Sequence, residues 1–126
     1  MHPDINSFIL AHPPNLMAFA VSDAELDSRI IPESYIMLRD VDKLPFGSTY
    51  LEPEATAKKL GLKKPVTLVD NECCIVMGTS LLNAFDRLEV AEYSAKAIIN
   101  AQSLGNMVKI DDSEIDRIID AFRLEK

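Results

Sequence analysis

The segment from residue 80 to residue 104 restricts the fold of this chain more than any other. Its apolar side chains recur at steps of three and four residues, at Leu81, Leu82, Phe85, Leu88, Ala91, Ala95, Ile98, Ile99 and Ala101. This spacing predicts one amphipathic helix, roughly 37 Å long at 1.5 Å per residue. Thr79 or Ser80 suits its N-cap, and Gly105 suits its C-terminal cap.

Short runs of β-prone residues precede this helix. The mostly apolar residues 6–11 are followed by His12 and two prolines, which predicts a strand that delivers His12 to its C-terminal end. Residues 66–69 and 74–77 are β-rich runs separated by the polar residues 70–72, which predicts a strand, a tight turn and a strand. Residues 35–38 are also β-prone and predict a further short strand.

Three shorter helices are predicted between and after these strands. Residues 15–21 have helical apolar spacing after the prolines, and residues 53–60 begin with a proline and precede Gly61, a candidate left-handed C-cap. The last helix starts at Asp111 and is expected to bury one stripe, formed by Ile115, Ile118, Ile119 and Phe122. Strands that alternate with helices predict an α/β sandwich. The 126 residues contain no internal repeat or linker, so we expect one domain over residues 1–126.

The charge of the chain excludes several kinds of partner. Thirteen Lys and Arg against twenty Asp and Glu give a net charge of −7, and no basic cluster is longer than Lys63-Lys64, so nucleic acid is a disfavoured partner. No apolar run approaches about 18 residues and the N-terminus does not resemble a signal peptide, so we expect no membrane association and a cytoplasmic location. Cys73 and Cys74 are adjacent, which makes a mutual disulfide geometrically poor and fits a reducing compartment.

Two side chains are candidates for chemistry. His12, at a strand end, suits a metal ligand or a general base, and equally an ordinary histidine at a sheet edge. Glu72, in the predicted turn, suits a metal ligand or an exposed turn carboxylate. The two cysteines are expected to pack as small apolar residues. The sequence contains no glycine-rich phosphate loop, no His-Glu-x-x-His, no Cys-x-x-Cys and no nucleophile elbow.

Several segments, taken in order, resemble the class II aldolase/adducin family. They are residues 2–6 with 9–14, residues 31–33, residues 44–48, residues 67–73 at the position of the family's Asn-His-Gly turn, residues 78–92, Leu104-Gly105 and residues 111–115. Among family members the resemblance is nearest to the fuculose and rhamnulose phosphate aldolases. It implies an αβα sandwich with a mainly antiparallel sheet, truncated here at the N-terminus, where the family carries its phosphate loops and its acid/base glutamate.

The resemblance also implies a site for zinc or another divalent cation. The family holds this ion with a His-x-His pair and a third histidine, and these positions fall on Leu10, His12 and Glu72 of this chain. Leucine cannot coordinate a metal, so His12 and Glu72 are the only candidate metal ligands, and no catalytic residue is assigned. The expected cofactor is zinc or another divalent cation if this site functions, and otherwise none.

Three functions follow as hypotheses. The first is a truncated sugar-phosphate aldolase homologue with a degenerate metal site and little or no carbon–carbon lyase activity. The second is an active aldolase-type enzyme completed by a partner chain, and the third is a non-catalytic, adducin-like interaction module. The resemblance implies a homo-oligomer, a tetramer in the family, with a sugar phosphate as a possible ligand. The edge of the strand over residues 7–11 is expected to be covered by another chain.

Overall fold

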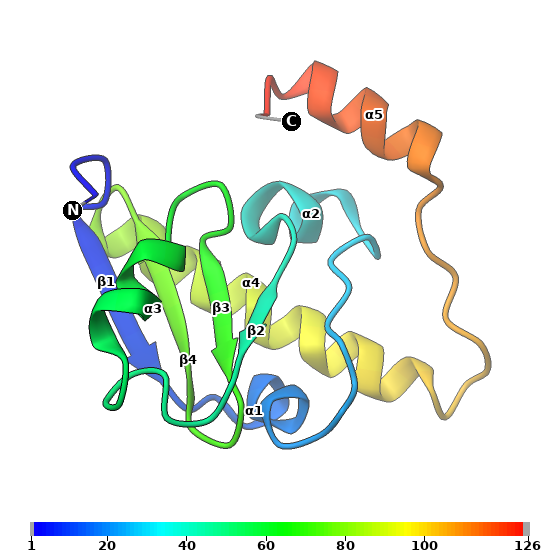
Figure 1. Cartoon of the computed structure of the whole chain (residues 1–126). Helices are drawn as coiled ribbons and strands as arrows, with labels where there is room; N and C mark the ends of the chain where they lie inside the picture. The colour runs from blue at the N-terminus through cyan, green and yellow to red at the C-terminus, as the bar shows by residue number, and fades with distance from the viewer. Residues whose placement is uncertain (1, 125–126) are drawn as a thin grey trace.

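A mixed four-stranded sheet forms the centre of the protein in the computed structural model, which describes residues 2–124 (Figure 1). The strands are β1 (Ser7–Ala11), β2 (Asp42–Leu44), β3 (Val66–Val69) and β4 (Cys73–Gly78), in the order β1-β4-β3-β2. Strand β4 is antiparallel to both β1 and β3, and β2 is parallel to β3. The prediction of a mainly antiparallel sheet in an α/β fold is therefore confirmed.

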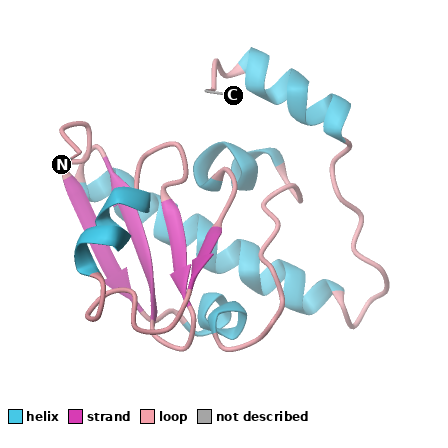
Figure 2. Cartoon of the chain, in the orientation of Figure 1, coloured by secondary structure: helices cyan, strands magenta, loops and turns pink. Residues whose placement is uncertain are grey.

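Helices cover both faces of this sheet (Figure 2). They are α1 (Pro14–Ala20), α2 (Pro32–Leu38), α3 (Pro53–Lys59), α4 (Leu81–Ala101) and α5 (Asp112–Ala121). Helices α1, α2 and α4 pack on one face in the larger hydrophobic cluster, and α3 lies over the other face. None of the helices described here is long and apolar enough to cross a bilayer.

Strands β3 and β4 form the centre of the core, because every residue of both is buried. On the α4 side, Leu68, Cys74 and Val76 join the larger cluster, whereas on the α3 side a smaller cluster contains Leu44, Val69, Cys73 and Ile75. The α3 face therefore has the thinner cover.

Helix α4 confirms the main prediction, with small differences at its ends. The Ser80 hydroxyl accepts a hydrogen bond from the Asn83 backbone N–H at 3.0 Å, as expected of an N-cap. Gly78 lies where the strand meets the helix, since a Cβ there would be 2.6 Å from the Ala84 nitrogen. The helix ends at Ala101, short of Gly105, whose N–H donates to the Ala101 carbonyl at 3.1 Å.

The predicted strand over residues 35–38 is wrong, because these residues form the end of helix α2. Pro32 occupies the first turn, and the helical repeat buries Ser34, Tyr35 and Leu38 together. The Ser34 hydroxyl lies 2.6 Å from that of Ser94 in α4. Packing against α4 therefore outweighs the β propensity of this segment. The strand of this region is β2, which begins a few residues later at Asp42.

Two predictions at helix ends also need correction. Gly61 is not a left-handed cap, since α3 ends at Lys59 with Leu60 as its C-cap at φ −79°, and Gly61 instead forms a bridge with Lys64. Helix α5 buries Ile115 alone, while Phe122 is 58% exposed. The expected buried stripe is incomplete because α5 lies away from the sheet, above α2 (Figure 1).

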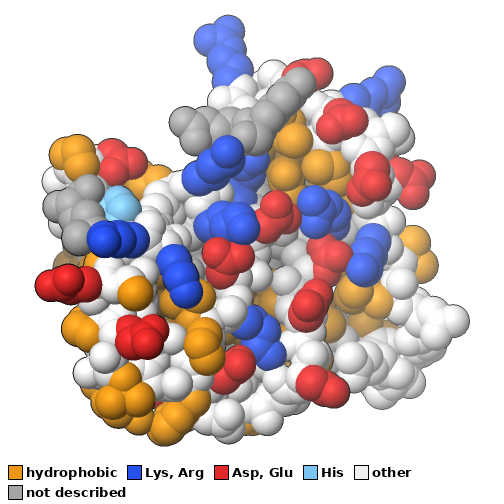
Figure 3. Space-filling view, in the orientation of Figure 1, with side chains coloured by type: hydrophobic (Ala, Val, Ile, Leu, Met, Phe, Trp, Pro, Cys, Tyr) orange, Lys and Arg blue, Asp and Glu red, His pale blue; other side chains and the backbone are white. Residues whose placement is uncertain are grey.

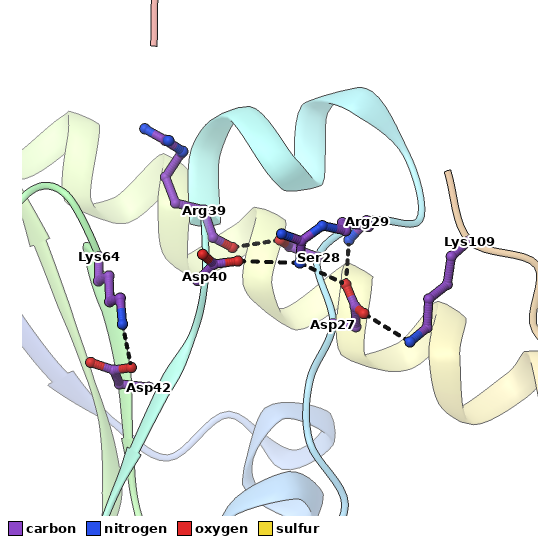
Figure 4. A network of polar contacts seen from close by, with 8 residues as sticks. All are labelled: Asp27, Ser28, Arg29, Arg39, Asp40, Asp42, Lys64 and Lys109. Carbon is purple, nitrogen blue, oxygen red and sulfur yellow. Dashed lines mark hydrogen bonds and ion pairs between the residues drawn. The ribbon is translucent and has the colours of Figure 1, made fainter. Parts of the chain in front are cut away.

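A polar network holds the segment before α5 to the rest of the protein (Figure 4). The Lys109 ammonium lies 2.9 Å from the Asp27 carboxylate, and the Ile110 N–H donates to the Arg29 carbonyl at 2.8 Å. Burial alone would raise the pKa of Asp27, but the Arg29 backbone N–H and the Lys109 ammonium outweigh it and lower that pKa below its ordinary value. Asp27 is therefore charged at neutral pH.

The start of α1 is closed by a carboxylate from another helix. The residue before α1 is Pro13, which provides no side-chain cap. Instead, the Glu92 carboxylate of α4 accepts hydrogen bonds from the backbone N–H groups of Asn15 at 3.1 Å and Leu16 at 2.8 Å, and from the Asn15 side chain at 3.0 Å. These bonds satisfy N–H groups that the first turn leaves without partners. They also fix the segment that begins at His12.

We expect Glu92→Ala to lower the free energy of unfolding by about 2 kcal/mol, because charge-assisted bonds to the first turn of α1 are lost. Urea denaturation followed by circular dichroism measures this change. Glu89→Ala, on an exposed position of the same helix, is the matched control and should change stability by less than about 0.5 kcal/mol. Equal losses in the two variants would contradict the capping role.

Candidate functional site

The candidate site lies at the edge of the sheet where β1 and β3 end. Ala11 pairs with Cys74, so the antiparallel register continues to His12 opposite Cys73, with Glu72 one position further in the turn. The structure therefore places His12 and Glu72 at the same end of the sheet. The sequence predicted a strand end for His12 and a turn for Glu72. His12 is exposed and Glu72 is half-buried.

Leu10 shares the outer face of β1 with His12. Side chains alternate along this strand, and its burial alternates with them: Ile9 and Ala11 pack against the larger core cluster, while Phe8 and Leu10 are 54% and 47% exposed. Leu10 and His12 thus point to the same side, at the spacing of the His-x-His pair in the resembling family. An apolar isobutyl group occupies the first of those two positions.

The Glu72 carboxylate is bound to the loop that follows β2. Its Oε1 accepts a hydrogen bond from the Gly47 N–H at 2.6 Å, and its Oε2 accepts one from the Thr49 hydroxyl. Gly47 has φ +93°, and a Cβ there would lie 2.7 Å from Leu51 Cδ1, so the turn that presents this N–H requires glycine. Both carboxylate oxygens therefore have partners within the protein.

Further hydrogen bonds fix the same loop. The Ser48 hydroxyl donates to the Pro45 carbonyl, and the Thr56 hydroxyl of α3 donates to the Ser48 carbonyl, both at 2.6 Å. Sequence reasoning missed these contacts of Glu72, because Gly47 and Thr49 lie more than twenty residues away along the chain. The glycine and the threonine in a polar loop were the only signals, and neither identifies its partner.

The metal-ligand chemistry available at this edge is limited. Among residues 2–124 no group of three or more His, Cys, Asp or Glu side chains is arranged to hold a metal ion. Cys73 and Cys74 are free and buried, and they lie in the sheet beside Glu72. Burial raises the pKa of Cys74 to about 12, and burial together with the Glu72 charge raises the pKa of Cys73.

We expect both cysteines to be unreactive in the folded protein. A thiol of pKa about 12 is ionised in roughly one molecule in ten thousand at pH 8, and the thiolate is the reactive form. A thiol-specific disulfide reagent at pH 8 should therefore label both cysteines only at the rate of unfolding, and urea should release the full reaction. Rapid labelling of the native protein would contradict this assignment.

The fold is an αβα arrangement, a mixed four-stranded sheet with helices on both faces. The family model described as "Class II Aldolase and Adducin N-terminal domain" matches residues 1–99. The chain therefore belongs to the class II aldolase and adducin family. A comparison with curated protein sequences finds no significant match.

Solved structures share the fold of this chain. An aldolase II superfamily protein from Pseudomonas syringae has a TM-score of 0.76 and 24% identity, over 93% of this chain and 48% of that one. A sugar-phosphate aldolase from Thermotoga maritima has a TM-score of 0.65 and 25% identity, over 82% and 48%. An L-fuculose 1-phosphate aldolase has a TM-score of 0.72 and 24% identity, over 98% and 58%. The chain thus spans about half the length of these structures.

Proposed function

We propose that this chain is a class II aldolase-type domain that does not assemble a zinc site of its own and does not cleave carbon–carbon bonds by itself. The observation that carries the proposal is the Glu72 carboxylate, whose two oxygens accept hydrogen bonds from the Gly47 N–H and the Thr49 hydroxyl. These two bonds direct the carboxylate toward the loop over residues 45–51, and each oxygen keeps one further lone pair. A catalytic zinc usually needs three protein ligands, and at this edge Leu10 provides none.

Zinc binding tests this proposal directly. Isothermal titration and elemental analysis of the purified protein should find no stoichiometric zinc. The second histidine of the chain, His2, provides the control. It lies elsewhere, and its Nε2 is 2.6 Å from the Ala57 carbonyl oxygen. About one equivalent of zinc that is lost in His12→Ala but kept in His2→Ala would overturn the proposal.

The converse experiment restores the ligand set. The double variant L10H/E72H places three imidazoles at the positions that the family uses, so we expect it to gain zinc binding at about one equivalent. Adding His12→Ala to this variant should abolish the binding again. Circular dichroism controls for folding, since Glu72→His also removes the bonds to the loop over residues 45–51. Zinc binding by the wild type equal to that of the double variant would contradict a lost site.

A second candidate function is association, and the outer face of β1 favours it. Strand β1 is an edge strand, and its exposed Phe8 and Leu10 line an apolar groove of about 270 Å³ against Pro53, Ala57 and Leu60 on the α3 side. Figure 3 shows hydrophobic side chains gathered at the lower left of the molecule, where Figure 1 draws the loop between β2 and α3. An unpaired strand edge with apolar flanks is a template for pairing with another chain. We propose a second copy of this chain as the partner.

Sedimentation tests the association. We expect analytical ultracentrifugation to show mass increasing with concentration, and Phe8→Ser with Leu10→Ser to shift the protein toward the monomer by about tenfold or more in the association constant. The control is Leu104→Ser, a position 89% exposed at the far end of α4. A monomer at every concentration, or equal effects of the control, would contradict the proposal.

Ligand binding is a separate part of the proposed function. Two of the solved structures are described as aldolases of sugar phosphates, and we propose a sugar phosphate as the class of ligand for the oligomer of this chain. The single chain is expected to show no turnover of such a compound.

A further inference from the structure

Strand β1 has one edge without a strand partner in the part of the chain that the structure describes. In the order β1-β4-β3-β2 it pairs with β4 alone, and Figure 1 draws it as the outermost strand. Edge strands usually carry a lysine, a proline or a bulge that prevents further pairing. The five residues of β1, SFILA, include neither lysine nor proline, and they pair with five consecutive residues of β4 without a bulge. The edge is therefore open to another strand.

Apolar side chains flank this edge on both faces of the sheet. On the α3 face, Phe8 and Leu10 are about half exposed. On the α4 face, Leu81 and Phe85 are 68% and 48% exposed. These two residues lie on the same side of α4 as Glu92, at helical steps of four and seven residues, and Glu92 contacts the first turn of α1, which follows β1. A strand added to β1 therefore meets apolar surface above and below it.

The edge carries no charge, although the chain has a net charge of −7. None of the residues of β1 is charged, and neither are those that line the groove between β1 and α3. A partner recognised by opposite charge is therefore not indicated here. The surface requires an uncharged, apolar strand, and β1 of a second copy is such a strand.

The sequence of β1 is also complementary to itself in antiparallel pairing. A two-fold axis through Ile9 pairs Ser7 with Ala11, and Phe8 with Leu10, of the other copy. Each apolar side chain on the outer face then lies beside another across the two strands. A register shifted by one residue opposes outer side chains to inner ones, and a shift by two leaves three of the five pairs. The axis through Ile9 uses the whole strand.

We propose that two copies of this chain pair through their β1 strands, with Ile9 on the two-fold axis, and form one continuous eight-stranded sheet. The inference rests on the proposed association through β1 and adds how the two copies meet. The axis is perpendicular to the sheet, so both α3 helices lie on one face and both α4 helices on the other.

The exposed area indicates the strength of this dimer. Phe8 and Phe85 each expose roughly 100 Å². With Leu10 and Leu81, which are exposed to a similar extent, the apolar surface is on the order of 400 Å² per copy, about half of the 800 Å² per partner in a standard stable interface. Backbone hydrogen bonds between the strands add to it. We therefore expect a reversible dimer with a dissociation constant in the micromolar range.

Disulfide crosslinking tests the register. An equimolar mixture of the variants Phe8→Cys and Leu10→Cys, treated with oxidised glutathione, should give a linked dimer with one chain of each, because these Cα atoms lie about 5 Å apart across the strands. Each variant alone should crosslink about tenfold less, since identical positions are then about 8 Å apart, beyond the reach of a disulfide. Leu104→Cys mixed with Phe8→Cys measures random collision, and the wild type controls for the buried native cysteines.

Hydrogen exchange of the unaltered chain tests the pairing without any substitution. Raising the protein concentration should slow the exchange of alternate amides within residues 7–11, those that point to the free edge, because the intervening amides already bond to β4. The amides of β2, the strand at the opposite edge of the sheet, are the control and should not change.

The outcomes distinguish this inference from the proposed association. Preferential mixed crosslinking together with slowed exchange supports paired β1 strands. If the mass increases with concentration, but the mixture crosslinks no better than each variant alone and the exchange of residues 7–11 is unchanged, the strand pairing is overturned and the association stands. A monomer at every concentration overturns both.

Discussion

The carboxylate of Glu92 fixes the part of the protein on which the candidate site depends. Strand β1 is followed by His12 and two prolines, which donate no backbone hydrogen bonds, and helix α1 begins without a side-chain cap of its own. Glu92 satisfies the N–H groups of Asn15 and Leu16 from across the interface between α1 and α4. Because α4 is the longest element and packs on the sheet, this contact sets where the chain leaves β1. The position of His12 follows from it.

The two faces of the sheet differ for a related reason. On the α4 face, the long helix, α1 and α2 enclose a continuous core, and the inner side chains of β1 belong to it. On the other face a single two-turn helix covers the strands, and the outer side chains of β1 remain exposed at the edge. The face that carries Leu10 and His12 is thus the one that the chain itself covers least. Because of this asymmetry, the proposed association and the proposed ligand binding would both use the surface that carries Leu10 and His12.

The sequence predicts those parts of the structure whose determinants are local. The long apolar periodicity gives α4, the polar turn between two β-rich runs gives β3 and β4, and the prolines place His12 at a strand end. The prediction fails where contacts between residues far apart in the sequence determine the structure. Residues 35–38 become helical because they pack on α4, and Glu72 binds a loop some twenty-five residues away. The family positions of Leu10, His12 and Glu72 could be read from the resemblance, but the partners of the Glu72 carboxylate could not.

The hydrogen bonds of Glu72 explain how the candidate site can remain ordered without a metal ion. A metal holds together side chains that come from distant segments, and its loss ordinarily loosens them. Here the Glu72 carboxylate joins the turn after β3 to the loop after β2 through two hydrogen bonds, with a glycine and a hydroxyl as donors. A neutral imidazole has one acceptor nitrogen and could not make both bonds. In the proposed function, the Glu72 carboxylate therefore keeps the structural role of a metal ligand, because it connects distant segments. It does not provide a metal ion for catalysis.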